Sequence, residues 1–197
     1  MMSSDQIYKT LGAPCEGLYK EKGSRFLAFG FSVSSEEDIR LQLGIMKKKF
    51  FDARHICYAY RLGPGGESWR ANDNGEPSST AGKPILGQLI SFNLSDVLMV
   101  VIRYFGGIKL GTGGLINAYR TAARSALENA AIVEKQVMET FRFSYNYDQT
   151  DKVMKALHDI GAQIVEQSFT DDPLPCHLTV RIPPSGRQSL LSSLEPT

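Results

Sequence analysis

The chain has 197 residues, a net charge of +1 and 42% hydrophobic residues, a balance without the strong basic excess of an autonomous nucleic-acid-binding domain. No apolar run approaches the roughly 20 residues that a membrane span needs. Its three cysteines, with no C-x-x-C pair and no secretory signal, support neither a disulfide framework nor a thiolate metal site. We therefore expect a globular cytoplasmic protein with no membrane partner and no metal or other cofactor, and composition leaves the oligomeric state open.

The first part of the chain combines strand patterns with one amphipathic helix. Residues 1–20, which contain two glycines and a proline, are interpreted as an irregular or edge segment. Alternating apolar residues then predict a strand over 24–33. A serine cap followed by acidic residues predicts a helix that ends in three lysines at 47–49. The runs 55–62 and 68–71, separated by a glycine-rich turn, predict a β-hairpin.

The next stretch predicts two helices on either side of a buried strand. Thr80 is the expected N-cap of a helix over 81–92, with Pro84 in its first turn. The apolar run 97–102 predicts a buried strand over 97–104. The helix expected at 115–131 is rich in alanine, which allows close packing against a sheet.

The last part of the chain predicts a separate small domain in the order βαββα. We expect a domain boundary near the end of the alanine-rich helix, which gives domains of residues 1–134 and 135–197. One more strand would complete a ferredoxin-like split βαβ domain, and the sequence ends before it. Either the domain is truncated or another segment occupies that edge. The expected elements are a strand at 137–147, a helix at 149–160, strands at 163–169 and 176–182, and a helix at 186–194.

A glycine-rich loop between the buried strand and the alanine-rich helix is the main candidate site. Five of the 18 glycines lie within residues 103–114, which indicates a constrained loop of defined shape. Backbone N–H groups at such a loop and at the helix starts near Thr80 and Thr112 can hold an anion. A phosphate site, a protein-binding surface and a purely structural loop all remain open. The candidate binding residues are Lys83, Arg103, Gly106, Gly107, Lys109, Gly111, Gly113 and Gly114.

A second set of polar residues offers an alternative site of catalytic type. Asp52, His55, Asp73 and Glu76 could supply an acid, a base or metal ligands. Their spacing is not diagnostic, because Asp73 before Asn-Gly is equally explained by an Asx turn. Cys57 lacks a third partner and is better explained as a buried thiol than as a nucleophile. We therefore predict no catalytic residue, with a metal- or carboxylate-dependent hydrolase as the alternative function.

Five motifs in order resemble the IMPACT family, including its bacterial YigZ-type members. The resemblance extends from about Lys20 to Leu127. It implies an α+β fold in which a domain similar to ribosomal protein S5 domain 2 precedes a ferredoxin-like domain similar to domain V of elongation factor G. The motifs are Asp-Ala-Arg-His at 52–55, Asp-Asn-Gly-Glu-Pro at 73–77, Thr-Ala-Gly-Lys-Pro at 80–84, Arg-Tyr-Phe-Gly-Gly at 103–107, and Leu-Gly-Thr-Gly-Gly-Leu at 110–115 with Tyr119.

The resemblance also implies a function. Eukaryotic members of the family regulate translation by competing for an activator of a starvation-responsive initiation-factor kinase. A non-enzymatic protein linked to translation is therefore expected. Its partner would be RNA, the ribosome or a translation-associated protein.

Overall fold

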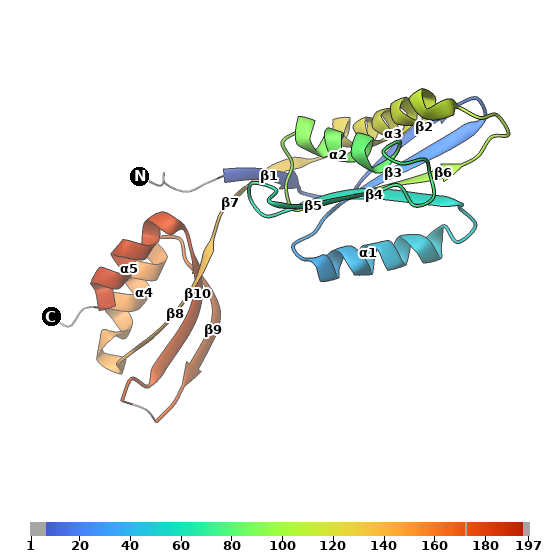
Figure 1. Cartoon of the computed structure of the whole chain (residues 1–197). Helices are drawn as coiled ribbons and strands as arrows, with labels where there is room; N and C mark the ends of the chain where they lie inside the picture. Colours follow the sequence, from blue (N-terminus) through green and yellow to red (C-terminus); the bar gives the residue numbers. More distant parts are fainter. Residues whose placement is uncertain (1–6, 172, 195–197) are drawn as a thin grey trace. The chain divides into compact units, whose positions relative to one another are not determined.

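The computed structural model describes residues 7–171 and 173–194, which form two compact units (Figure 1). The first unit spans Tyr8–Lys135, and the second comprises Ile7 and the residues from Gln136 on. Two hydrophobic clusters lie in the first unit and one lies in the second. Each unit therefore has a core of its own and is described separately.

The first unit is built on a five-stranded antiparallel sheet in the order β2-β3-β6-β4-β5. The central strand, β6, begins with a continuous apolar run over 97–102, and it is buried at every position except its last residue. Such a run is typical of a strand with both faces covered. The strands are β2 (Cys15–Glu21), β3 (Ser24–Ser32), β4 (His55–Leu62), β5 (Ser68–Asn72) and β6 (Val97–Tyr104).

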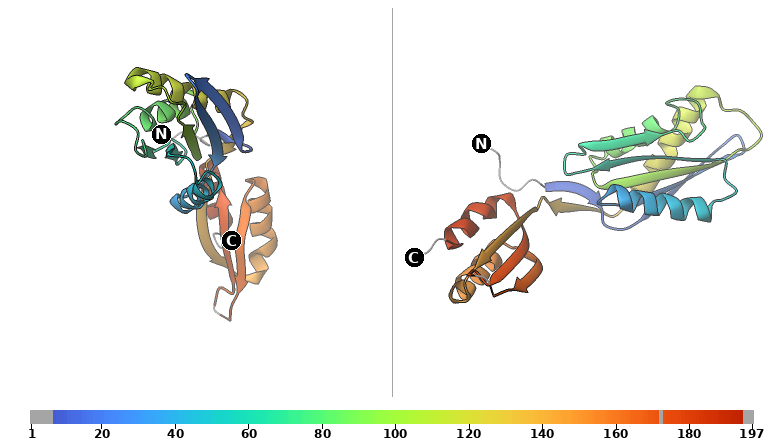
Figure 2. Two further views of the ribbon diagram at one scale, coloured as in Figure 1. Left: turned by 90° about the vertical axis from the view of Figure 1, so that its right-hand side faces the viewer. Right: turned by 60° about the horizontal axis from the view of Figure 1, so that its bottom comes forward.

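Helices cover both faces of this sheet, α1 (Glu36–Lys49) on one face and α2 (Gly82–Ser91) with α3 (Gly111–Glu128) on the other (Figures 1 and 2). The alanines of α3 allow the close approach expected from the sequence. A Cβ added to Gly17 of β2 would lie 2.3 Å from the backbone nitrogen of Ala126. The predicted helix–sheet packing therefore depends on small residues from both elements.

Within the described range, the segment expected to be irregular or at an edge forms two strands, and the second of them, β2, is an edge strand of the five-stranded sheet. β1 (Ile7–Leu11) pairs with β7 (Ile132–Gln136) in a separate two-stranded sheet. β2 forms a hairpin with β3 because Lys22 and Gly23 adopt positive φ values of 45° and 77°. The glycine and proline at positions 12 and 14 separate two strands instead of preventing both.

The second unit has the predicted order βαββα around a three-stranded antiparallel sheet, β8-β10-β9. The third strand in sequence lies between the first two, as in a split βαβ fold. The described residues supply no fourth strand beside β8. The predicted α+β fold class is confirmed. The elements are β8 (Glu139–Tyr145), a 3-10 turn (Tyr147–Gln149), α4 (Thr150–Asp159), β9 (Gln163–Phe169), β10 (Cys176–Ile182), a 3-10 turn (Pro184–Gly186) and α5 (Arg187–Leu194).

Candidate functional site

The glycine loop joins the end of β6 to the start of α3. Gly106 is fixed by packing, because a Cβ at this position would lie 1.9 Å from the carbonyl carbon of Gly23. Its N–H donates to Ser24 Oγ at 3.1 Å. Gly107 and Gly111 have positive φ values of 89° and 70° and open space around them. Part of the loop is therefore required by the fold, and part is free to approach a ligand.

A cavity of about 400 Å³ lies beside this loop in the first unit. Its walls come from the residues before and at the start of β4, the loop before α2, the end of β6 and the start of α3. Cationic and apolar side chains share the lining. The lining residues are Arg54, His55, Glu76, Pro77, Arg103, Phe105, Lys109, Leu110, Gly111, Thr112 and Leu115.

Arg103 is the most buried cation of this cavity, with 6% of its surface exposed. Its Nη1 donates to Glu76 Oε1 at 2.7 Å, whereas its buried Nε has no hydrogen-bond partner in the structure. The guanidinium also lies over the rings of Phe105 and Phe26, at 5.4 and 5.6 Å from their centroids. An unpaired buried N–H is costly, so a hydrogen-bond acceptor that reached Nε from the cavity would relieve that cost.

The N-terminus of α3 contributes further donors. The residue at its N-cap position, Leu110, provides no side-chain hydrogen bond. Gly111 and Thr112, the first two residues of the helix, line the cavity. The first backbone N–H groups of a helix lack partners within the helix and carry a partial positive charge. This end of α3 therefore favours a negative group in the cavity.

A buried polar chain holds Glu76 in place behind the cavity. Tyr119 Oη donates to Glu76 Oε1 at 2.8 Å, and Cys57 Sγ lies 3.3 Å from Tyr119 Oη. Burial is the main reason that the pKa of Cys57 rises to about 12, although its bond to Tyr119 lowers it. Burial also raises the pKa of Tyr119, with further increases from Cys57 and Glu76. The thiol and phenol thus stay protonated, and Tyr119 orients the carboxylate that pairs with Arg103.

The four residues of the alternative catalytic set do not converge. Asp52 accepts from Tyr104 Oη at 2.7 Å, His55 Nδ1 contacts Asn74 O at 3.1 Å, and only His55 and Glu76 of the set line the cavity. Within residues 7–171 and 173–194, no group of three His, Cys, Asp or Glu side chains is placed to hold a metal ion. The geometry therefore gives no specific observation in favour of the hydrolase alternative.

Asp73 has a structural role that the sequence interpretation assigned to Thr80. Asp73 Oδ1 accepts from the N–H groups of Ala81 and Gly82 at 3.0 and 2.8 Å, and Oδ2 accepts from that of Ser79 at 2.8 Å. Thr80 Oγ1 instead donates to Pro77 O. The expectation that Thr80 caps α2 and leaves unpaired donors there is wrong, because a carboxylate from the preceding loop occupies those donors.

The predicted binding residues are only partly brought together. Arg103, Lys109 and Gly111 line the cavity, whereas Lys83 lies in a different groove beside Trp69. Gly106 packs on the β2–β3 turn, Gly107 does not line the cavity, and Gly113 and Gly114 lie within α3. The sequence interpretation missed Arg54, Phe105 and Thr112 as lining residues. All three belong to the five motifs, so motif membership was the signal that could have found them.

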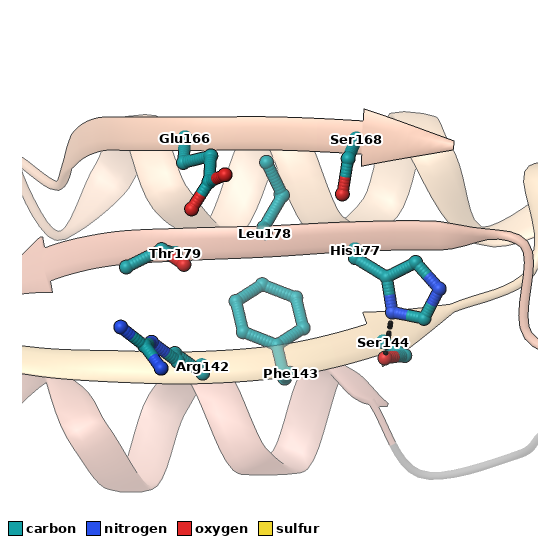
Figure 3. A pocket seen from close by; sticks show the side chains of 8 residues that line it. All are labelled: Arg142, Phe143, Ser144, Glu166, Ser168, His177, Leu178 and Thr179. Carbon is teal, nitrogen blue, oxygen red and sulfur yellow. Dashed lines mark hydrogen bonds between the residues drawn. The ribbon is translucent and has the colours of Figure 1, made fainter. Parts of the chain in front are cut away.

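A second depression, of about 370 Å³, lies on the open face of the β8-β10-β9 sheet in the second unit (Figure 3). His177 of β10 is held there by hydroxyl groups, with Nδ1 2.6 Å from Ser144 Oγ and Nε2 2.9 Å from Thr170 Oγ1. Arg142, Glu166 and other polar side chains surround it. The sequence-predicted site residues all lie outside this depression.

The fold and the first cavity together define a two-unit α+β protein with a cation-lined cavity in its first unit. A family model described as the Impact N-terminal domain matches residues 22–127. YvyE of Bacillus subtilis, an IMPACT family member, is 40% identical over 149 residues, which are 76% of this chain and 69% of that protein. The chain therefore belongs to the IMPACT family, as the five motifs predicted.

Solved structures with similarity to the chain include one described only as a hypothetical protein, with a TM-score of 0.78 and 28% identity over 96% of this chain and 91% of that one. The structure of the two-domain translational regulator Yih1 is also similar, with 26% identity and a TM-score of 0.37, and the match covers 62% of this chain and 47% of the Yih1 chain. Translational regulation is stated there of Yih1. No helix in the described part of the chain is long and apolar enough to cross a membrane.

Proposed function

We propose that this IMPACT family protein acts in the cytoplasm as a non-enzymatic, translation-linked RNA-binding protein. The cavity beside the glycine loop holds a phosphate group of the RNA. The link to translation rests on membership of the IMPACT family, and the choice of RNA as partner rests on the chemistry of the cavity.

The observation that carries the proposal is the unpaired Nε of Arg103 beside the uncapped end of α3. The Nε is buried and without a partner, and the first amides of α3 line the same cavity. Lys109 and Arg54, both exposed, add positive charge to the lining. A phosphate would accept hydrogen bonds from the unpaired Nε and from the first amides of α3. Contacts to phosphate of this kind do not depend on the identity of the base.

Phe105 extends the cavity with an aromatic surface. Its side chain is 54% exposed, and Ile108 in the same loop is 56% exposed. The Arg103 guanidinium lies against the Phe105 ring. Aromatic rings on which bases stack, combined with cations for the backbone, are typical of sites for single-stranded RNA. The cavity therefore fits an unpaired stretch of RNA better than a duplex.

Binding of oligoribonucleotides at several salt concentrations tests the proposal. The variant Arg54→Ala with Lys109→Ala should bind more weakly because two cations are removed from the lining. The slope of log affinity against log salt should fall by about 0.7 for each phosphate that the variant no longer neutralises. Lys48→Ala, at the end of α1 on the opposite face of the sheet, is the matched control and should bind like the parent. Identical curves for all three proteins, with folding verified by circular dichroism, would remove the cavity from RNA binding.

A crosslinking pull-down distinguishes the remaining partners of a translation-linked protein. Crosslinked RNA that disappears in the Arg54→Ala and Lys109→Ala variant supports the proposal. Capture of a protein alone, lost in that variant, would contradict the proposal and make the loop a protein-binding surface.

A further inference from the structure

We infer that the cavity beside the glycine loop accepts a nucleotide bearing a terminal phosphate, either as a free mononucleotide or as the end of an RNA chain. The inference rests on the proposed RNA-binding function and goes further by naming the part of the ligand that enters. Three features of the cavity carry it: its charge, its size and lining, and the rigidity of Arg103.

The charge of the lining matches a terminal phosphate better than an internal one. Arg54, Arg103 and Lys109 are cations, and Glu76 is the one carboxylate among the lining residues. Since Glu76 pairs with Arg103, the charges of Arg54 and Lys109 remain uncompensated within the lining. A phosphate monoester carries about −1.5 to −2 charges at neutral pH. A diester within the chain carries one negative charge, which would leave part of this positive charge unmatched.

The size and lining of the cavity fit more than a phosphate ion. A volume of about 400 Å³ falls within the range of roughly 300–1,000 Å³ for small-molecule sites. Pro77, Phe105, Leu110 and Leu115 provide an apolar wall. An anion alone gains nothing from that wall, whereas a base attached to the phosphate can stack on Phe105. The combination of apolar wall and cations is what a nucleotide requires.

Arg103 is held ready for such a ligand before binding. Its Nη1 is fixed by Glu76, which in turn accepts from Tyr119, and its Cζ lies over the ring of Phe26. The guanidinium therefore loses little conformational freedom when its Nε meets a phosphate oxygen. Preorganised donors of this kind increase affinity by lowering the cost of ordering on binding.

The experiment compares three internally labelled oligoribonucleotides of one sequence, phosphorylated at the 5′ end, at the 3′ end or at neither end. Binding to the full chain is measured by fluorescence anisotropy, with adenosine and uridine monophosphates as unlabelled competitors. We expect one of the phosphorylated oligonucleotides to bind about tenfold more tightly than the unphosphorylated one, the effect of one added charge-assisted hydrogen bond. Lys109→Ala should remove most of this preference, and Lys48→Ala should retain it.

The role of Phe105 is tested separately with inorganic phosphate as a second competitor. Phe105→Ala should weaken competition by the mononucleotides at least fivefold and leave competition by inorganic phosphate unchanged, because only the base stacks. Equal weakening for both competitors would contradict a nucleotide site.

The outcomes separate this inference from the proposed function. Equal binding of the three oligonucleotides without competition by mononucleotides would overturn the inference and leave RNA binding in place. Binding of mononucleotides without binding of any oligonucleotide would support the nucleotide site and overturn the RNA function. Absence of binding by every probe would overturn both.

Discussion

Arg103 and Glu76 form an ion pair with an Nη1 to Oε1 distance of 2.7 Å, in which the two side chains are 7% and 3% exposed. The pair joins the end of β6 to the loop before α2. Both charges have left water, so each depends on the other for compensation. The same guanidinium carries the unpaired Nε beside the cavity, so the stability of the first unit and the geometry of its candidate site are linked through one residue.

Removing Arg103 should destabilise the protein strongly. We expect Arg103→Ala to lower the free energy of unfolding by about 3–5 kcal/mol, because Glu76 is left buried without its cation. Urea unfolding followed by circular dichroism measures the change. Arg124→Ala is the control, since Arg124 pairs with Glu128 on the exposed surface of α3 and should cost less than about 1 kcal/mol. An equal decrease in the free energy of unfolding for the two variants would show that burial does not determine how much the Arg103–Glu76 pair contributes to stability.

Replacing Asp73 by alanine should destabilise the start of α2. Its carboxylate accepts three backbone N–H bonds, and loss of such a cap costs about 1–2 kcal/mol. Thr80→Val should cost less, because the Thr80 hydroxyl is bonded to the carbonyl of Pro77 and not to the N–H groups of α2. Urea unfolding of the two variants at neutral pH compares them. A larger decrease in the free energy of unfolding for Thr80→Val than for Asp73→Ala would show that Thr80 is the cap of α2.

The contribution of Asp73 should also depend on pH. Burial raises the pKa of Asp73, but hydrogen bonds from the N–H groups of Gly82, Ser79 and Ala81 outweigh it and leave the pKa below its ordinary 3.8. Stability from this carboxylate is therefore present above pH 3.8 and is lost as the pH falls through the lower folded pKa. The difference in unfolding free energy between the parent and Asp73→Ala should narrow in that range. A difference independent of pH would contradict a charged cap.

The elements with strong periodicity were predictable from the sequence, whereas those set by distant contacts were not. The apolar run of β6 predicts a buried strand, and the alanine-rich pattern of α3 predicts a helix packed on a sheet, because each pattern is compatible with only one of these elements. β1 is different, because it pairs with β7, which lies near the other end of the first unit, and its five residues carry little alternation. Local patterns contain no information about such a partner.

The sequence predicts which loop lies beside the cavity, but it does not predict the full set of residues that line the cavity. The glycine run identifies the loop that lies beside the cavity, and Arg103 and Lys109 both line that cavity. Sequence proximity wrongly added Lys83, because the chain turns between Asp73 and α2 and directs Lys83 to another groove. The pairing of Arg103 with Glu76 spans 27 positions and could not be read from spacing alone.

Two glycines of the glycine-rich stretch 103–114 should have opposite effects on stability when replaced by alanine. Gly106→Ala should destabilise the protein by more than about 1 kcal/mol, because the new Cβ meets the backbone of Gly23. Gly113→Ala should stabilise it by about 0.5–1 kcal/mol, since the position lies in α3 with nothing within 4 Å of the added Cβ. Thermal unfolding of both variants provides the comparison. Destabilisation by Gly113→Ala would show that α3 needs flexibility at its start.

The buried thiols should be unreactive in the folded protein. Cys15, Cys57 and Cys176 are free and buried, and burial raises the pKa of Cys57 to about 12. Little Cys57 thiolate is therefore present at about pH 8. Because all three sulfur atoms belong to buried residues, iodoacetamide should label none of them until a denaturant is added. Ser68→Cys, at an exposed position of β5, should be labelled rapidly under the same conditions. Rapid labelling of Cys57 in the folded parent would revive a nucleophilic role.

The two units should fold independently of each other. Their hydrophobic clusters share no residue, and no strand of the five-stranded sheet belongs to the second unit. A fragment of residues 1–135 retains both clusters of the first unit together with β1 and its partner β7 up to Lys135. We expect this fragment to unfold in one cooperative transition with the midpoint that the first unit shows in the full chain, because a unit with its own core needs no other to fold. Amide hydrogen exchange with mass spectrometry, carried out at increasing urea concentrations, measures the unfolding midpoint of the first unit and the protection of its strands in both proteins. Loss of protection in β6 of the fragment would show instead that the first unit depends on residues after 135.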